Sequence, residues 1–351
     1  MSNLHLGSRP RLVSGRVIRL GAFSVRFSPR VMVVGLVLLA MTVAIGIVTM
    51  LHGTMELTFG EVVRALVGDG EDGVIRTVRN RRLPRLVTAM GVGGSLGVAG
   101  AVFQSLSRNP LGSPDIIGFT SGAATGAVIQ IVVLDGGILA TAIAAVTGGV
   151  LTALAVYALA RKDGVSGGLR LILVGIGIGA ITSAITSFLM VRADLDDATQ
   201  AQLWQSGSLT ARGWPHALAV LVAVVVLMPA LLVAARRLSV MEMGDDAATS
   251  LGVPVERYRF GVMVLAVALT AIAVAATGPI AFIALAAPQI VRRLVGRGGV
   301  LVMPSFLMGA SLLVLADLLS QSLDVGVRTP VGLVTSLLGG VYLVVLLARR
   351  V

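Results

Sequence analysis

Long runs without a charged residue alternate with short charged segments along most of this chain. Nine runs contain no Asp, Glu, Lys or Arg, and they lie at residues 31–51, 86–107, 116–134, 136–160, 171–191, 213–235, 260–291, 298–316 and 329–348. A helix needs about 20 apolar residues to cross the hydrocarbon core of a membrane. We therefore predict that each run forms at least one transmembrane helix.

The longest run, 260–291, is too long for one crossing. As a single helix its residues would extend about 48 Å at 1.5 Å per residue. It contains the sequence TGP at 277–279, and Gly-Pro strongly favours a break. We divide it into 260–277 and 279–294, which predicts an all-α polytopic membrane protein with ten transmembrane helices. They form one domain over 31–349, behind a basic tail at 1–30.

The charges between the runs predict the orientation. Ten crossings place both ends of the chain on one side of the membrane. With both ends in the cytoplasm, 19 of the 28 Lys and Arg residues lie inside and 9 outside, as expected from the positive-inside rule. Six of the nine outer arginines lie in the outer loop 52–85, four of them in RNRRLPR at 79–85. Either nearby acidic residues balance them in a long loop, or they form a docking surface for an acidic partner.

Composition excludes several classes of function. The chain is 56% hydrophobic and 13% charged, whereas soluble proteins are about 25% charged. It has no cysteine, its three histidines are scattered, and its one lysine, Lys162, is not part of a phosphate-binding loop. We therefore expect no catalytic residue, no metal site and no ATP bound by this chain. No acid lies centrally in a span, which favours an external energy source over coupling to an ion gradient.

Small residues recur every four positions in two runs and predict close helix packing there. They are Gly93, Gly97 and Ala101 in one run, and Gly175, Gly179 and Ser183 in the other.

Two cytoplasmic segments have the features of ordered structures. SRNPLGSPD at 107–115 combines two prolines with a glycine, so it forms either a plain turn or a gate at the inner mouth of a pathway. The loop 238–259 contains MGDDAATSLG, which predicts a short helix with Asp245 and Asp246 in its first turn and Gly252 at its end. Pro254 favours the start of a second short helix. Two short helices joined by a turn would form a rigid knob that fits a groove in a soluble partner.

Several long motifs resemble one known family of transporters. RLPRLVTAMGVGGSLGVAGAVFQSLSRNPLGSPDIIGFTSGAATG at 82–126 is similar to the signature of the FecCD family, the permease subunits of ATP-driven importers for iron–siderophore complexes, haem and vitamin B12. Four further motifs match in the same order: LWQSGSL at 203–209, MGDDAATSLGVPVER at 243–257, TGPIAFIALAAPQIVRR at 277–293 and TPVGLVTSLLGGVYLVVLL at 329–347. The resemblance spans residues 31–349 and is strongest to permeases for ferric enterobactin.

The resemblance implies a type II importer fold and a set of partners. These are a second permease subunit, a paralogue rather than an identical copy, two cytoplasmic ATPase subunits that hold ATP and magnesium, and a siderophore-binding protein outside the membrane. Nucleic acid is not expected as a partner. The localisation implied is the cytoplasmic (inner) membrane.

The resemblance also implies roles for individual residues. Docking of the binding protein falls on Arg82 and Arg85, while a further docking arginine of the family is matched here by Gln321, for which Arg328 is a substitute. The cytoplasmic gate falls on Asn109, Pro110, Leu111, Gly167 and Gly168. Coupling to the ATPase falls on Glu242, Met243, Gly244, Asp245, Asp246, Ala248, Leu251 and Gly252.

The function expected is thus ATP-driven import of a ferric siderophore. One alternative keeps the family but changes the cargo to vitamin B12 or haem. Two others change the class, to an ion-coupled secondary transporter or to a membrane enzyme such as an intramembrane protease. No Ser/His pair and no paired acids within the spans support the enzyme.

Overall fold

The computed structural model describes residues 16–20, 23–53, 55–115, 117–161, 168–296, 299–322 and 329–348. Each predicted span contains one main helix in the structure. These helices are α1 (Pro29–Leu51), α4 (Leu83–Ser107), α5 (Phe119–Val132), α6 (Ile138–Ala160), α7 (Gly168–Arg192), α9 (Trp214–Met241), α11 (Val255–Thr277), α12 (Ile283–Val295), α13 (Val302–Ser322) and α14 (Val331–Ala348).

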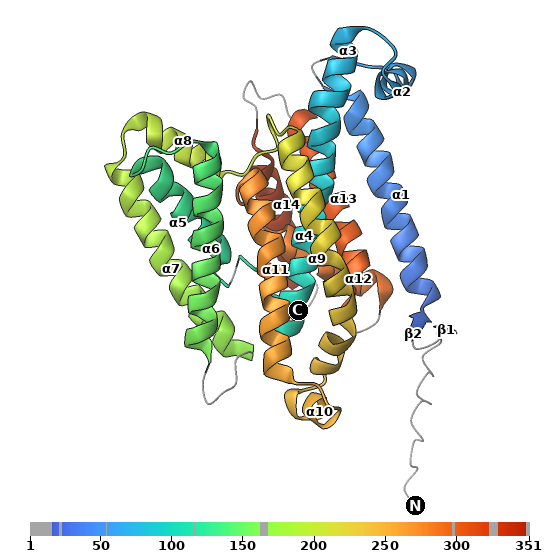
Figure 1. Cartoon of the computed structure of the whole chain (residues 1–351), viewed down its shortest axis with the longest axis vertical. Helices are drawn as coiled ribbons and strands as arrows, with labels where there is room; N and C mark the ends of the chain where they lie inside the picture. Colours follow the sequence, from blue (N-terminus) through green and yellow to red (C-terminus); the bar gives the residue numbers. More distant parts are fainter. Residues whose placement is uncertain are drawn as a thin grey trace, which may run out of the picture.

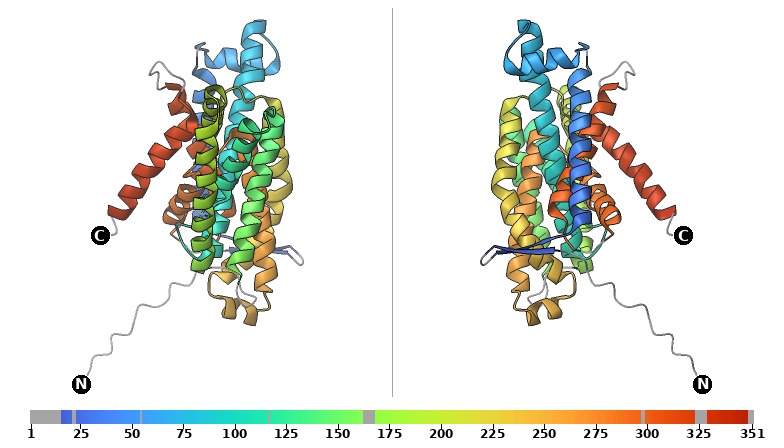
Figure 2. Two further views of the ribbon diagram at one scale, coloured as in Figure 1. Left: turned by 90° about the vertical axis from the view of Figure 1, so that its left-hand side faces the viewer. Right: turned by 90° about the vertical axis from the view of Figure 1, so that its right-hand side faces the viewer.

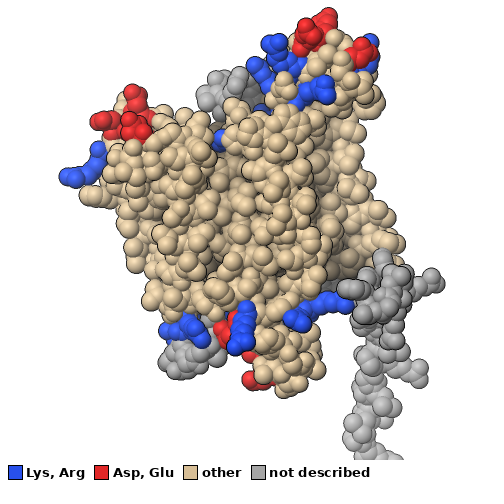
Figure 3. Space-filling model, in the orientation of Figure 1, with Lys and Arg blue, Asp and Glu red and all other residues tan. Residues whose placement is uncertain are grey.

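Seven helical segments in the described ranges are long and apolar enough to cross a membrane, and α5 and α14 are shorter apolar helices. The remaining helix, α12, has 13 residues. The all-helical class is therefore confirmed, and the arrangement fits the predicted number of ten. Figure 3 shows the charged residues of one face gathered at the two ends of the molecule, with an apolar band between them.

A small antiparallel hairpin, β1 (Arg16–Leu20) with β2 (Phe23–Phe27), precedes α1 and was not predicted. Each strand alternates an arginine or serine with apolar residues, a period of two that is typical of strands. This signal was overlooked because the segment was interpreted only as a basic tail.

The predicted division of the longest run is confirmed. Helix α11 ends at Thr277, and the N–H of Gly278 donates to the carbonyl of Val274 at 2.7 Å. Gly278 has φ +75°, and Phe282, just before α12, has φ +69°. The chain thus leaves α11 through a left-handed residue, followed by Pro279, which lacks an N–H to continue the helix.

Helix α4 is the centre of the bundle and contacts α9, α11, α12 and α13. Its small residues allow this. A Cβ on Gly97 would lie 2.2 Å from the carbonyl oxygen of Ser305 in α13, and one on Gly100 would lie 1.7 Å from that of Ala284 in α12. Glycine lets these helix backbones approach more closely than any larger residue would. The packing role predicted for the small residues of α4 is confirmed.

The second set of small residues agrees only in part. Gly175 in α7 lies against the backbone of Ile117, and Gly179 lies near Gly118. Ser183, one turn further, is exposed.

The helices form a main group around α4 and a second group of α5, α6, α7 and α8 (Leu195–Gln205) beside it (Figure 1). Helix α1 begins and α14 ends at the same end of the molecule, where the short helix α10 (Asp245–Ser250) also lies. Figure 2 shows α14 leaning away from the bundle. An even number of crossings requires such an arrangement of the first and last helices.

The segment expected to be an outer loop, 52–85, is largely helical. It contains α2 (Phe59–Val67), α3 (Asp72–Thr77) and the π-helical turn η1 (Val78–Arg82). A capping box formed by Thr58 and Glu61 begins α2, since each side chain satisfies a free N–H of the other residue. Helices α3, η1 and α4 run on without a break from Asp72 to Ser107.

Candidate functional site

At the outer end of the bundle, Arg85 forms an ion pair with Asp317. Arg85 Nη2 lies 2.7 Å from Asp317 Oδ1, and its Nε lies 3.1 Å from Oδ2. Asp317 is 1% exposed and also accepts a hydrogen bond at 3.0 Å from Gln321 Nε2. The position of the predicted docking residue Arg85 and the position of Gln321 thus converge on one buried carboxylate, which joins α4 to α13.

The second predicted docking residue, Arg82, joins the outer helix to α1. Its Nη1 donates to the carbonyl of Met50 at 2.6 Å, and its Nη2 donates to the carbonyl of Met55. Met50 lies in the last turn of α1, where carbonyls have no partner within the helix. Arg82 therefore caps α1, while Arg328 lies outside the described residues.

Four other arginines near this end are exposed: Arg64, Arg76, Arg79 and Arg81. Within the described part of the chain, none of them forms an ion pair. The nearby carboxylate of Glu61 accepts hydrogen bonds from the backbone and side chain of Thr58, and these lower its pKa below the ordinary value. We call Arg64, Arg76, Arg79 and Arg81 the outer arginine cluster (Figure 3).

The π-helical turn fixes the position of the middle of this cluster. In a π-turn, hydrogen bonds run from residue i to i+5, and such turns are frequent at functional sites. Trp214 Nε1, in the first turn of α9, donates to the carbonyl of Arg79 at 2.9 Å. The backbone that carries Arg79 and Arg81 is therefore attached to the main bundle although both side chains point to solvent.

At the opposite end, α10 forms most of the predicted knob. It begins at Asp245, after Gly244 with φ +122°, and Gly252 follows it with φ +79°. The expectation of a second short helix after Pro254 was wrong, because Pro254 directly precedes the long helix α11. Proline is favoured at a helix start of any length, so this signal did not predict how far the helix continues.

The knob has a charged base and an apolar tip. At its base, Arg259 of α11 donates to both carboxylate oxygens of Asp245 at 2.9 Å. Ala248 is buried beneath α10, whereas Met243 and Leu251 are 73% and 66% exposed. Two large apolar side chains exposed at a polar end of the molecule favour a contact with a soluble partner.

The predicted gate segment lies beside the knob. Arg108, with φ +49°, ends α4 and forms an ion pair with Asp245. Asn109 Oδ1 accepts from the N–H of Leu111 at 2.9 Å, which holds the turn around Pro110. Leu111 is 44% exposed. Of the other gate residues, Gly168 is the first residue of α7 and Gly167 lies outside the described residues.

Helix α12 contacts both of these regions. Its Gln289 Nε2 donates to the carbonyl of Pro110 at 2.7 Å. One turn later, Arg292 Nη2 lies 3.0 Å from Glu242 Oε1, and Glu242 is the residue that ends α9.

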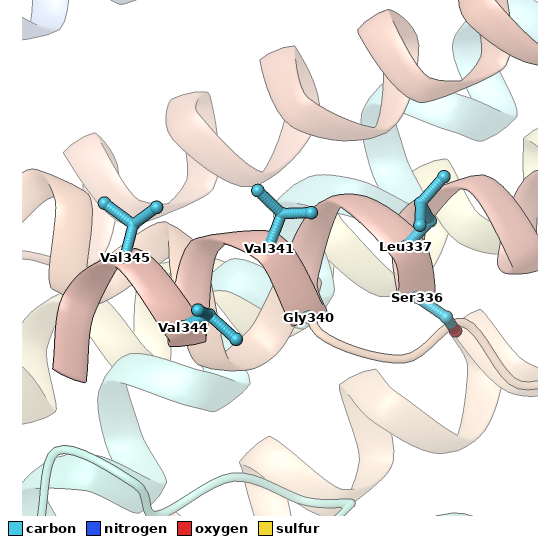
Figure 4. Close-up of a pocket in the computed structure, with 6 residues that line it drawn as sticks. All are labelled: Ser336, Leu337, Gly340, Val341, Val344 and Val345. Carbon is cyan, nitrogen blue, oxygen red and sulfur yellow. The ribbon is translucent and has the colours of Figure 1, made fainter. Parts of the chain in front are cut away.

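The hollow drawn in Figure 4 lies along the outer face of α14 and is lined by Ser336, Leu337, Gly340, Val341, Val344 and Val345. Its only polar side chain is Ser336, so it offers no charge or ligand set for chemistry. A search of the described residues finds no group of three His, Asp or Glu that could hold a metal.

Residues 38–349 match the FecCD transport family. The chain belongs to this family. It is 42% identical to the ferric enterobactin transport system permease protein FepG of Escherichia coli (strain K12), over 92% of this chain and 98% of that protein. It is 36% identical to the probable siderophore transport system permease protein YfhA of Bacillus subtilis (strain 168), over 90% and 94% of the two chains.

Two further relatives extend the comparison. The cobalamin import system permease protein BtuC of Halobacterium salinarum is 37% identical over 77% of this chain and 72% of that protein. An inward-facing metal-chelate type ABC transporter has a similar structure, with a TM-score of 0.81 and 28% identity over 91% of this chain and 99% of that chain. This FecCD protein is therefore a multi-pass permease subunit of an importer and not an enzyme.

Sequence reasoning missed several residues that organise the two ends of this FecCD permease: Asp317, Arg108, Arg259, Gln289 and Arg292. Their partners lie on helices far away in the sequence, so no local spacing could identify them. Asp317 alone gave a signal, because an acid at the end of an apolar run requires a partner when it is buried.

Proposed function

We propose that this FecCD permease is the membrane subunit of an ATP-driven importer that carries a ferric siderophore across the cytoplasmic membrane, with both chain ends in the cytoplasm. The observation that carries the proposal is the 42% identity to the Escherichia coli ferric enterobactin permease over almost the full length of both chains. This favours a catecholate cargo of the enterobactin type. The cobalamin permease among the relatives makes vitamin B12 the second candidate.

The proposed partners are a paralogous permease, two ATPase subunits and an outer siderophore-binding protein. Docking of the binding protein is assigned to the outer end, where the sequence predicts Arg82 and Arg85 as contacts. Because those two side chains already have partners within the chain, the exposed outer arginine cluster is added to the proposed surface. Exposed positive charges attract and orient an acidic partner.

The knob is the proposed contact for an ATPase subunit. Met243 and Leu251 supply an apolar tip that fits a groove, while Asp245 attaches its base to Arg259 and Arg108. Movement of the ATPase dimer on binding ATP would then move the knob together with α9 and α11. The gate at 107–113 would open by rigid-body rearrangement of helices.

The direct test is reconstitution of the permease with its partner permease, the ATPase and the binding protein in proteoliposomes. We expect uptake of radiolabelled iron from ferric enterobactin only when ATP and the binding protein are both present. Uptake of cobalamin in place of the siderophore would replace the proposed cargo. Accumulation driven by an ion gradient without the ATPase would contradict the proposed class and favour a secondary transporter.

A further inference from the structure

Helix α12 is short, but it connects two regions that the proposed mechanism requires to move together. Residues 289 and 292 are three apart, so their side chains leave α12 on the same side, one turn from each other. Gln289 contacts the gate segment and Arg292 contacts the segment that begins the knob.

The contact with the gate is buried. Gln289 is 6% exposed, and its amide donates to the carbonyl of Pro110 at 2.7 Å. A turn earlier on α12, the carbonyl of Leu285 accepts from Gln104 Nε2 at 3.0 Å, and Gln104 lies in the last turn of α4. A buried hydrogen bond is costly to leave unmade. The gate segment and the end of α4 are therefore attached firmly to α12.

The contact with the knob is more exposed. The side chains of Arg292 and Glu242 are 32% and 23% exposed. Glu242 directly precedes Met243 and Gly244, and α10 begins at Asp245. Displacement of the knob would therefore act on Arg292 through Glu242. This route is additional to the ion pair between Arg108 and Asp245.

We propose that α12 transmits movement of the knob to the gate, with the Glu242–Arg292 ion pair as its input and the Gln289–Pro110 hydrogen bond as its output. The proposal rests on the proposed function, because it names the positioning residues through which the ATPase acts on the gate. Helix α12 is suited to this role because its two polar contacts lie within one rigid turn. Its Ala287 and Val291 are fully buried beside them.

The test measures cargo transported per ATP hydrolysed in the complete complex in proteoliposomes. Glu242→Arg and Arg292→Glu should each lower this ratio about fivefold or more, and the double exchange should restore it. Gln289→Leu should lower the ratio while ATP hydrolysis continues. Arg293→Glu is the matched control, since Arg293 is exposed and has no ion pair within the described ranges, and it should keep the original ratio.

Unchanged ratios in the two single variants, or a double variant that is not restored, would overturn the proposal. A second measurement does not depend on those variants. Spin labels on Leu111→Cys and Leu294→Cys, both exposed positions in a chain without cysteine, should keep a constant separation with and without ATP. A separation that changes with ATP would also overturn it. If the unaltered complex fails to transport with ATP, the proposed function fails instead.

Discussion

At the residue scale, the ion pair between Arg85 and Asp317 shows how one arginine of the RLPR motif is used. A carboxylate that is 1% exposed is stable in an apolar bundle only when its charge is balanced and its oxygens accept hydrogen bonds. Arg85 and Gln321 provide both. The first role of Arg85 in this structure is therefore to join α4 to α13.

Removal of one partner of this pair should destabilise the protein more than removal of both. Arg85→Ala leaves the Asp317 charge buried without its partner and should lower the free energy of unfolding by about 3–5 kcal/mol. Arg85→Ala combined with Asp317→Ala removes the charge as well and should recover part of that loss. Thermal unfolding in detergent measures both, and equal stability of the single and double variants would show that the pair has no such role.

The docking surface allows a comparison between two sets of arginines. We expect Arg76→Glu with Arg79→Glu and Arg81→Glu to weaken binding of the binding protein at least tenfold, because three exposed charges are reversed. Arg82→Glu with Arg85→Glu should also weaken docking, but with a loss of thermal stability that the first variant does not show. Surface plasmon resonance at two salt concentrations measures affinity.

If reversal of the exposed set leaves the affinity unchanged at low salt, these three residues are not part of the docking surface. Since exposed charges are screened by salt, the original affinity should also fall as the salt concentration rises.

At the element scale, the close approach of α4 to α13 depends on glycine. Gly97→Ala places a methyl group 2.2 Å from the carbonyl oxygen of Ser305, so the two helices must separate. Overpacking of this kind costs about 1–3 kcal/mol. Gly177→Ala in α7 is the matched control, because a Cβ there meets no atom within 4 Å. Thermal unfolding of the two variants should therefore differ, and equal midpoints would contradict this account of the packing.

The knob gives a second prediction at this scale. Leu251→Glu places a charge at the exposed apolar tip and should weaken attachment of the ATPase, since burying an unpaired charge is costly. Leu251 is 66% exposed in the isolated chain, so the permease itself should fold normally. Co-purification of the ATPase with the variant measures attachment. Full recovery of an active ATPase complex would show that the tip does not enter a groove.

At the scale of the whole molecule, much of the architecture was predictable because each span is a local property. An uncharged run of about 20 residues must be helical in a membrane, and Gly-Pro at 278–279 fixed the division of the longest run. The MGDDAATSLG motif predicted α10 through its own capping residues. In contrast, the helical form of 52–85 was not predicted, because charged residues there were interpreted as loop.

The contacts between elements were less predictable. Arg108, Arg292 and Gln289 become significant only when α4, α9 and α12 lie side by side. Arg82 and Arg85 were identified through the family motif, which did not indicate their partners within the chain. Such pairings depend on the register of packed helices, and the sequence pattern of one helix contains no information about the register of its neighbour.

The central claim is that the arginine cluster and the knob lie on opposite sides of the membrane. The chain has no cysteine, so single cysteines at the exposed positions Asn80 and Ser250 can be labelled with an impermeant maleimide in intact cells and in inverted vesicles. We predict that Asn80→Cys reacts only from outside and Ser250→Cys only from the cytoplasmic side. Labelling of Asn80→Cys from the cytoplasmic side alone would contradict the account.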